Sequence, residues 1–222
     1  MDFAQRTPSF SKETVTKWLK ILMLLQIAGL ILSLFNHIPY GNSLCQWLQW
    51  LCSMGGIVCL FGLTTAGKRY MTAAILGSVQ LVLSMIESGI QSYAIWMTTL
   101  EISSLDNMQQ FNEIAAALDL AAMIAGIVYT YQLYHAHGDL IKDMDVSLSK
   151  KWYRLFVWSL AIGILKTVAG MIFSTIYGNL NINSTALISI FYTLISIPGQ
   201  IIILISIIYL YRTTQIIQNK ET

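Results

Sequence analysis

Three ionisable residues, Glu87, Asp119 and Lys166, stand inside long apolar stretches of this chain. A charge in hydrocarbon is costly unless it is paired, hydrated or neutralised by a proton, so such residues are candidates for function. Counting 1.5 Å per residue from the predicted inner helix ends places all three roughly 21 to 24 Å above the inner membrane boundary. We expect Lys166 to pair with Glu87 or Asp119, leaving the second carboxylate to bind a proton or cation. Alternatively, the acids reach the outer interface and Lys166 only ties helices together.

Small and polar residues recur at three-and-four spacing along each apolar stretch, which places them on one face of a helix. The stripe of the fifth stretch includes Gly163, Lys166 and Gly170. We expect these faces to point into the bundle, where they either pack helices closely or line a wet cavity. The glutamines and serines chosen as candidate polar lining are Gln26, Gln80, Ser84, Ser196 and Gln200.

Six apolar segments must position these side chains, and each is long enough to cross a hydrocarbon core of about 30 Å. They are Trp18 to Phe35, Trp47 to Thr65, Met71 to Ile95, Ile114 to Tyr134, Trp152 to Ile176 and Thr185 to Tyr211. The pattern predicts an all-α, polytopic membrane protein whose six transmembrane helices form one bundle domain over residues 1–222. Its expected location is the cell membrane, plasma or inner, with the lipid bilayer as partner.

Lysine and arginine are distributed unevenly among the connections between these segments. The connections 36–46, 96–113 and 177–184 contain neither residue, whereas the termini and the other connections contain nearly all of them. Basic residues are enriched on the cytoplasmic side of membrane proteins. The distribution therefore predicts three hairpins with both termini in the cytoplasm. The polar pieces 101–113 and 135–151 are expected to be loops.

Two local motifs invite a functional interpretation. His135 and His137 resemble a metal motif, but on a helix they point to different faces, and Gly138 after them fits a helix C-terminal cap. We therefore expect capping and no metal site. Pro198 and Gly199 interrupt the sixth segment, where proline deletes a backbone hydrogen bond and bends a helix. A kink is expected there, or a break that exposes backbone to a ligand.

Composition excludes several classes of function. Of the 222 residues, 55% are hydrophobic and only 11% are charged, and the net charge of +2 is too small to indicate a nucleic-acid partner. Cys45, Cys52 and Cys59 are spaced by seven, beyond disulfide reach along one helix. The chain contains no H-E-x-x-H, G-x-S-x-G or G-x-x-x-x-G-K-[ST] motif. We therefore predict no catalytic, cofactor-binding or metal-binding residues, and no enzyme.

Two kinds of function remain open. In the first, the polar stripes line a path for a small solute or an ion, or support such transport, and the three intramembrane charges couple the path to ions. In the second, the chain is a non-catalytic membrane subunit or scaffold, permease-like or accessory, whose stripes only pack helices. Homo-oligomers or partner membrane subunits are compatible with both.

Overall fold

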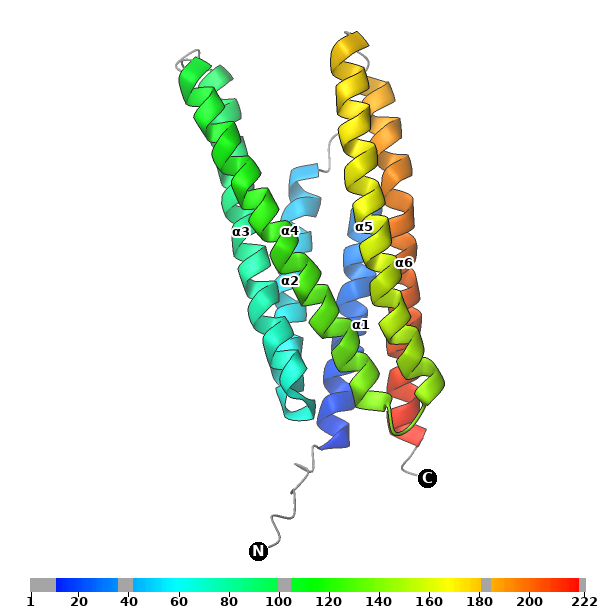
Figure 1. The fold of residues 1–222 in the computed structure, drawn as a ribbon. Helices are drawn as coiled ribbons and strands as arrows, with labels where there is room; N and C mark the ends of the chain where they lie inside the picture. The colour runs from blue at the N-terminus through cyan, green and yellow to red at the C-terminus, as the bar shows by residue number, and fades with distance from the viewer. Residues whose placement is uncertain (1–10, 36–41, 100–104, 181–184, 220–222) are drawn as a thin grey trace, which may run out of the picture.

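The computed structural model describes residues 11–35, 42–99, 105–180 and 185–219, which are almost entirely helical (Figure 1). No strand occurs in these residues. A short 3-10 helix, η1 (Leu63–Ala66), follows the second α-helix. The six α-helices are α1 (Lys12–Phe35), α2 (Asn42–Gly62), α3 (Lys68–Thr99), α4 (Leu105–Ile141), α5 (Val146–Leu180) and α6 (Thr185–Asn219).

All six α-helices of the described chain are long and apolar enough to cross a membrane. Their outer surfaces remain apolar, with large side chains such as Leu51, Leu165 and Ile201 half-exposed or more. Such surfaces suit lipid, because a helix in hydrocarbon satisfies its own backbone hydrogen bonds and exposes apolar side chains. The structure therefore confirms the prediction of an all-α chain with six potential membrane spans.

The two polar pieces expected as loops, 101–113 and 135–151, are helical over most of their described length. α4 begins at Leu105 and continues to Ile141, and α5 begins at Val146. The prediction that Gly138 caps the helix is therefore wrong. Gly138 lies inside α4, where a Cβ atom would stand 2.5 Å from Cε1 of Tyr153 on α5. The glycine is needed for the close approach of a neighbouring side chain instead.

The helices converge at one end of the bundle and diverge at the other (Figure 1). We call the end where α1 begins and α6 ends the core end, and the opposite end the splayed end. α1 packs against α2 and α6, α3 against α2 and α4, and α5 against α4 and α6. Toward the splayed end, the α3–α4 pair separates from the α5–α6 pair (Figure 1). Much of the buried apolar cluster therefore comes from helix segments near the core end.

An aromatic cluster joins four helices at the core end. Trp152 of α5 is fully buried, and its Nε1–H donates to Oγ1 of Thr213 on α6 at 3.2 Å. Its ring lies 4.7 Å from the ring of His137 and 5.6 Å from that of Tyr134, both on α4. The Tyr70 hydroxyl of α3 lies 2.9 Å from Nδ1 of His137. Aromatic contacts and buried hydrogen bonds thus hold the four helices α3, α4, α5 and α6 together here.

We predict that Gly62→Ala destabilises the bundle by about 1 to 3 kcal/mol, the usual effect of overpacking. A Cβ atom at Gly62 would stand 2.3 Å from Cε2 of Trp18, although the backbone (φ −63°) would accept alanine. The measurement is the thermal unfolding midpoint of the purified protein in detergent. Gly163→Ala is the control, since no heavy atom lies within 4 Å of its added Cβ, and its midpoint should not fall. Equal midpoints for both variants would contradict the packing of Trp18 on Gly62.

Candidate functional site

A cavity of about 490 Å³ lies between α1, α2 and α3, with one side chain each from α4 and α6. All its lining residues belong to the candidate membrane spans. No aspartate, glutamate, lysine, arginine or histidine lines it. The polar side chains of the lining are Gln26 and Ser33 of α1, Gln49 and Ser53 of α2, Gln80 and Ser84 of α3, and Tyr129 of α4.

Small residues provide the space for this cavity. Gly29 of α1 lines it, and a Cβ atom added there would meet no heavy atom within 4 Å. Gly56 of α2 also lines it, and an added Cβ there would be in ordinary contact with Leu22 at 3.7 Å. Glycines in membrane helices commonly bring backbones into contact. Here Gly29 leaves a void beside α1 instead.

Two glycine contacts between α3 and α4 place polar groups at the cavity wall. A Cβ atom at Gly77 would stand 3.1 Å from Cε2 of Tyr129, so the tyrosine ring lies directly against α3. A Cβ atom at Gly126 would stand 2.8 Å from Nε2 of Gln80, so the glutamine amide lies directly against α4. The absence of side chains at Gly77 and Gly126 therefore determines where the phenol and this amide lie.

The amide of Gln26 connects the cavity to α6. The Ser206 hydroxyl lies 3.2 Å from Oε1 of Gln26 and 2.7 Å from the carbonyl oxygen of Ile203, which also lines the cavity. A hydroxyl carries one hydrogen, so Ser206 donates to one of these acceptors at a time. Ser206 is buried, whereas Gln26 is half-buried. The Gln26 amide thus retains hydrogen-bonding capacity toward the cavity.

Three of the five predicted lining residues, Gln26, Gln80 and Ser84, lie in this cavity. The other two, on α6, do not line it. Ser196 donates its hydroxyl hydrogen to the carbonyl oxygen of Thr193 at 2.8 Å. Gln200 is half-buried on the same helix. Which polar residues line the cavity depends on which helix faces are neighbours, and the sequence does not specify that.

Sequence reasoning missed Gln49, Ser53 and Tyr129 as lining residues. Gln49 and Ser53 are four apart on α2, and the Ser53 hydroxyl donates to the Gln49 carbonyl oxygen at 2.9 Å. Their spacing was a usable signal, because residues four apart share a helix face. Tyr129 gave no such signal, since its position depends on the absence of a side chain at Gly77 of another helix.

The three intramembrane charges are not assembled into one cluster in the described structure. Glu87 of α3 and Asp119 of α4 are on helices that pack against each other. Gln91 donates its Nε2–H to Oε1 of Glu87 at 2.8 Å. Lys166 is exposed on α5 and forms no ion pair among the described residues. The expected pairing of Lys166 with either acid is therefore absent here.

The prediction that the stripe of α5 points into the bundle is wrong for Gly163 and Lys166, which are exposed. A Cβ atom added at Gly163 or Gly170 would meet no heavy atom within 4 Å. The physical reason is the divergence of the two helix pairs, which leaves this part of α5 without a neighbour from the α3–α4 pair (Figure 1).

The two histidines of α4 have separate surroundings. His137 is 1% exposed, and its Nε2 has no hydrogen-bond partner in the described part of the chain. His135 instead directs Nδ1 to the carbonyl oxygen of Tyr131 at 2.9 Å. Among the described residues, no three His, Cys, Asp or Glu side chains gather in a way that could hold a metal ion. His137 is therefore best explained as part of the aromatic packing around Trp152.

We predict that a cysteine at Ser84 reacts with a membrane-impermeant thiol reagent in intact cells or inverted vesicles, whereas one at Ser196 does not. Ser84 lines the cavity and Ser196 does not. The background variant would carry alanine at Cys45, Cys52 and Cys59, since Cys52 itself lines the cavity. Labelling is read by mass spectrometry. Equal labelling at both positions would contradict a distinct wet cavity.

Comparison with known proteins identified no relative of this chain. No protein-family model, no curated protein and no solved structure matches the chain. Its function is therefore inferred from the cavity, the charges and the packing of its helices.

Proposed function

We propose that this protein moves a small, neutral, polar solute across the cell membrane through the cavity between α1, α2 and α3. The proposal includes six spans arranged as three hairpins with both termini in the cytoplasm. Its main support is the uncharged polar lining of a cavity that lies within the candidate spans. The clustering of lysine and arginine near the termini and in alternate connections supports the orientation.

The chemistry of the lining favours a neutral polar solute over an ion. Glutamine amides such as those of Gln26 and Gln80 both donate and accept hydrogen bonds, as do the hydroxyls of Ser84 and Tyr129. Unsatisfied polar groups in hydrocarbon cost several kcal/mol, so water or a solute would satisfy them. The lining offers no charge to offset the desolvation of an ion. The volume of about 490 Å³ is typical of small-molecule sites.

A polar face of α3 extends from the cavity toward the splayed end. Gln80 and Ser84 line the cavity, and Glu87 and Gln91 follow at three-and-four spacing on the same helix face. Glu87 is half-buried, and Gln91 is exposed and donates a hydrogen bond to Glu87. These residues supply a polar route between the cavity and the splayed end. Glu87 and Asp119 would then act at the entrance and not on the bound solute.

The charges are divided between the two helix pairs that diverge. The α3–α4 pair carries Glu87 and Asp119, and the α5–α6 pair carries Lys166 (Figure 1). Approach of the two pairs would bring opposite charges together and offset their cost in hydrocarbon. Carriers commonly expose a central site by rocking one helix bundle against another. We therefore propose that pairing of Lys166 with an acid of α3 or α4 accompanies a closed state.

One observation favours a second candidate function, a non-catalytic membrane subunit. Lys166 is exposed between Gly163 and Gly170, and a Cβ atom added at either glycine would meet no heavy atom within 4 Å. An exposed lysine is costly in lipid, and small residues suit the docking of a helix. A partner subunit that supplies an acidic side chain to this face of α5 would account for both features.

Gly29→Leu should abolish solute passage without unfolding the protein. The leucine side chain would enter the cavity, because nothing lies within 4 Å of a Cβ atom at this position. Purified protein in liposomes would be tested for uptake of radiolabelled glycerol, urea and glutamine. Gly89→Leu is the matched control, since it adds the same side chain in open space on an exposed part of α3 outside the cavity.

The expected result is uptake of at least one of these solutes by the wild type and by Gly89→Leu, with Gly29→Leu at the level of protein-free liposomes. The melting temperatures of the variants establish that both are folded. Absence of uptake by the wild type would argue against this solute class. Uptake by Gly29→Leu equal to that of the wild type would show that the cavity is not the path.

A cross-linking experiment between α4 and α5 distinguishes the proposed carrier function from the alternative function as a membrane subunit. Cysteines at Asp119 and Lys166, in the variant lacking Cys45, Cys52 and Cys59, should form an intramolecular disulfide under mild oxidation if the two pairs approach. A pair at Asp119 and Val157 is the control, because Val157 is exposed nearer the core end of α5. Disulfides only between separate chains, detected by gel mobility, would contradict the closing motion and favour docking at Lys166.

A further inference from the structure

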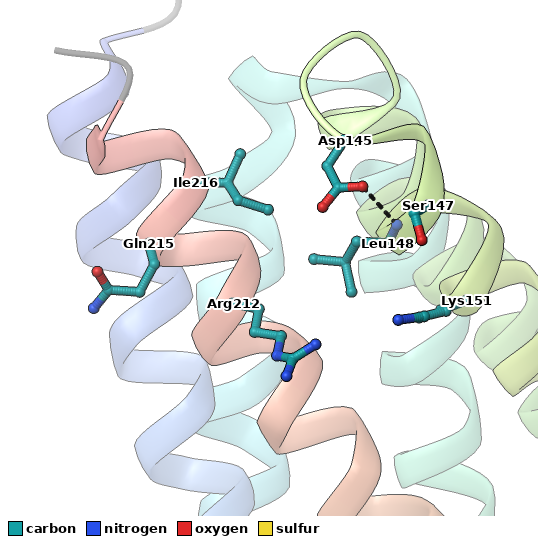
Figure 2. Close-up of a pocket in the computed structure, with 7 residues that line it drawn as sticks. All are labelled: Asp145, Ser147, Leu148, Lys151, Arg212, Gln215 and Ile216. Carbon is teal, nitrogen blue, oxygen red and sulfur yellow. Dashed lines mark hydrogen bonds between the residues drawn. The ribbon is translucent and has the colours of Figure 1, made fainter. Parts of the chain in front are cut away.

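A second, smaller pocket lies at the core end, between the start of α5 and the last part of α6 (Figure 2). Its volume is about 240 Å³. It is separate from the cavity between α1, α2 and α3, because the two share no lining residue. The residues that line it are Asp145, Ser147, Leu148, Lys151, Arg212, Gln215 and Ile216.

Two cationic side chains face this pocket from different helices. Arg212 reaches from α6 and Lys151 from α5, and both point into the space between the helices (Figure 2). Neither forms an ion pair within the described ranges of the chain. Two unpaired positive charges directed into one space favour an anion between them. Arginine binds phosphate oxygens through its planar fork, and lysine adds a point charge.

The single carboxylate of the lining is already engaged. Oδ1 of Asp145 accepts a hydrogen bond from the backbone N–H of Leu148 at 2.9 Å, which caps the start of α5. In Figure 2, Asp145 lies beside the turn between α4 and α5, whereas Lys151 and Arg212 lie further along their helices. Its charge therefore leaves an excess of one positive charge in the pocket.

An apolar surface continues from the cations toward the middle of the bundle. Ile208 and Leu204 precede Arg212 at four-residue spacing on α6, and Trp158 follows Lys151 by seven residues on α5. These spacings place them on the same helix faces as the cations. The three side chains are 45%, 49% and 64% exposed, respectively. A phosphate carried by a lipid would find its acyl chains beside this surface.

We propose that this pocket binds a phosphate group, with Lys151 and Arg212 as its ligands. A phospholipid headgroup is one source of the phosphate, and a soluble phosphorylated molecule is the other. The apolar surface formed by Leu204, Ile208 and Trp158 serves only the lipid. The site does not depend on the solute proposed for the larger cavity.

The test measures binding of phosphatidylglycerol to the purified protein by native mass spectrometry. Wild-type protein would be compared with the double variant Lys151→Gln and Arg212→Gln, and with Lys150→Gln as control. Lys150 is also exposed on α5 but does not line the pocket. We expect the apparent affinity to fall about fivefold for each pocket charge removed, and to remain unchanged in the control.

Glycerol 3-phosphate, added alone and as a competitor, distinguishes the two sources. Binding of phosphatidylglycerol that glycerol 3-phosphate does not displace supports a lipid ligand. Binding of glycerol 3-phosphate that the double variant loses supports a soluble phosphorylated ligand. Failure of the wild type to bind either probe, or equal binding by the double variant, would overturn the proposal.

A second measurement uses the unmodified protein and so avoids any effect of substitution on folding. Lysine acetylation by an amine-reactive ester is quantified by peptide mass spectrometry with phosphatidylglycerol or with glycerol 3-phosphate present. Lys151 should be protected relative to Lys150 by at least one of the two probes. Equal reactivity of both lysines with and without both probes would refute a phosphate site between α5 and α6.

Discussion

The packing of Trp152 at the core end supports the arrangement of most of the bundle. Its indole N–H donates to Thr213 of α6, and its ring contacts His137 and Tyr134 of α4. Lipid tails are as apolar as the helices, so association in a membrane depends on close packing and hydrogen bonds. Trp152 supplies both at a point where three helices meet. Tyr70 extends the contact to α3 through His137.

This concentration of contacts at one end has a consequence for the other. The α3–α4 and α5–α6 pairs diverge toward the splayed end (Figure 1). Lys166 is accordingly exposed, while Glu87 and Asp119 belong to the α3–α4 pair. A firmly packed end and a divergent end are compatible with the rocking motion that we propose for the two helix pairs. The polar cavity lies among α1, α2 and α3, within the candidate spans.

Sequence patterns located some of the cavity but not all of it. Gln26, Gln80 and Ser84 were recognisable because polar residues on one face of an apolar helix seek a polar space. Ser196 satisfied the same rule, yet its hydroxyl bonds to the backbone of its own helix. The same rule could not identify Tyr129, because the position of its ring depends on Gly77 of another helix. A periodic pattern identifies a face but not the neighbour of that face.

Local backbone rules showed the same limit at Gly138. A glycine after two histidines near the end of an apolar segment fits a helix cap, but α4 continues past it. The glycine is instead needed for packing, because Cε1 of Tyr153 lies 2.5 Å from the position that a Cβ atom would take. The helix ends only at Ile141, before the turn whose Asp145 caps α5.

The amino-acid sequence by itself determined that the chain is helical and holds six segments able to cross a membrane. Hydrocarbon forces a backbone to satisfy its hydrogen bonds within each helix, so apolar length alone is sufficient evidence. Only the tertiary structure decided which polar faces meet, that Lys166 stands apart from Glu87 and Asp119, and that Lys151 and Arg212 share a pocket. Those relations depend on side-chain volumes on different helices, such as Trp152 against His137, and no periodicity along one helix encodes them.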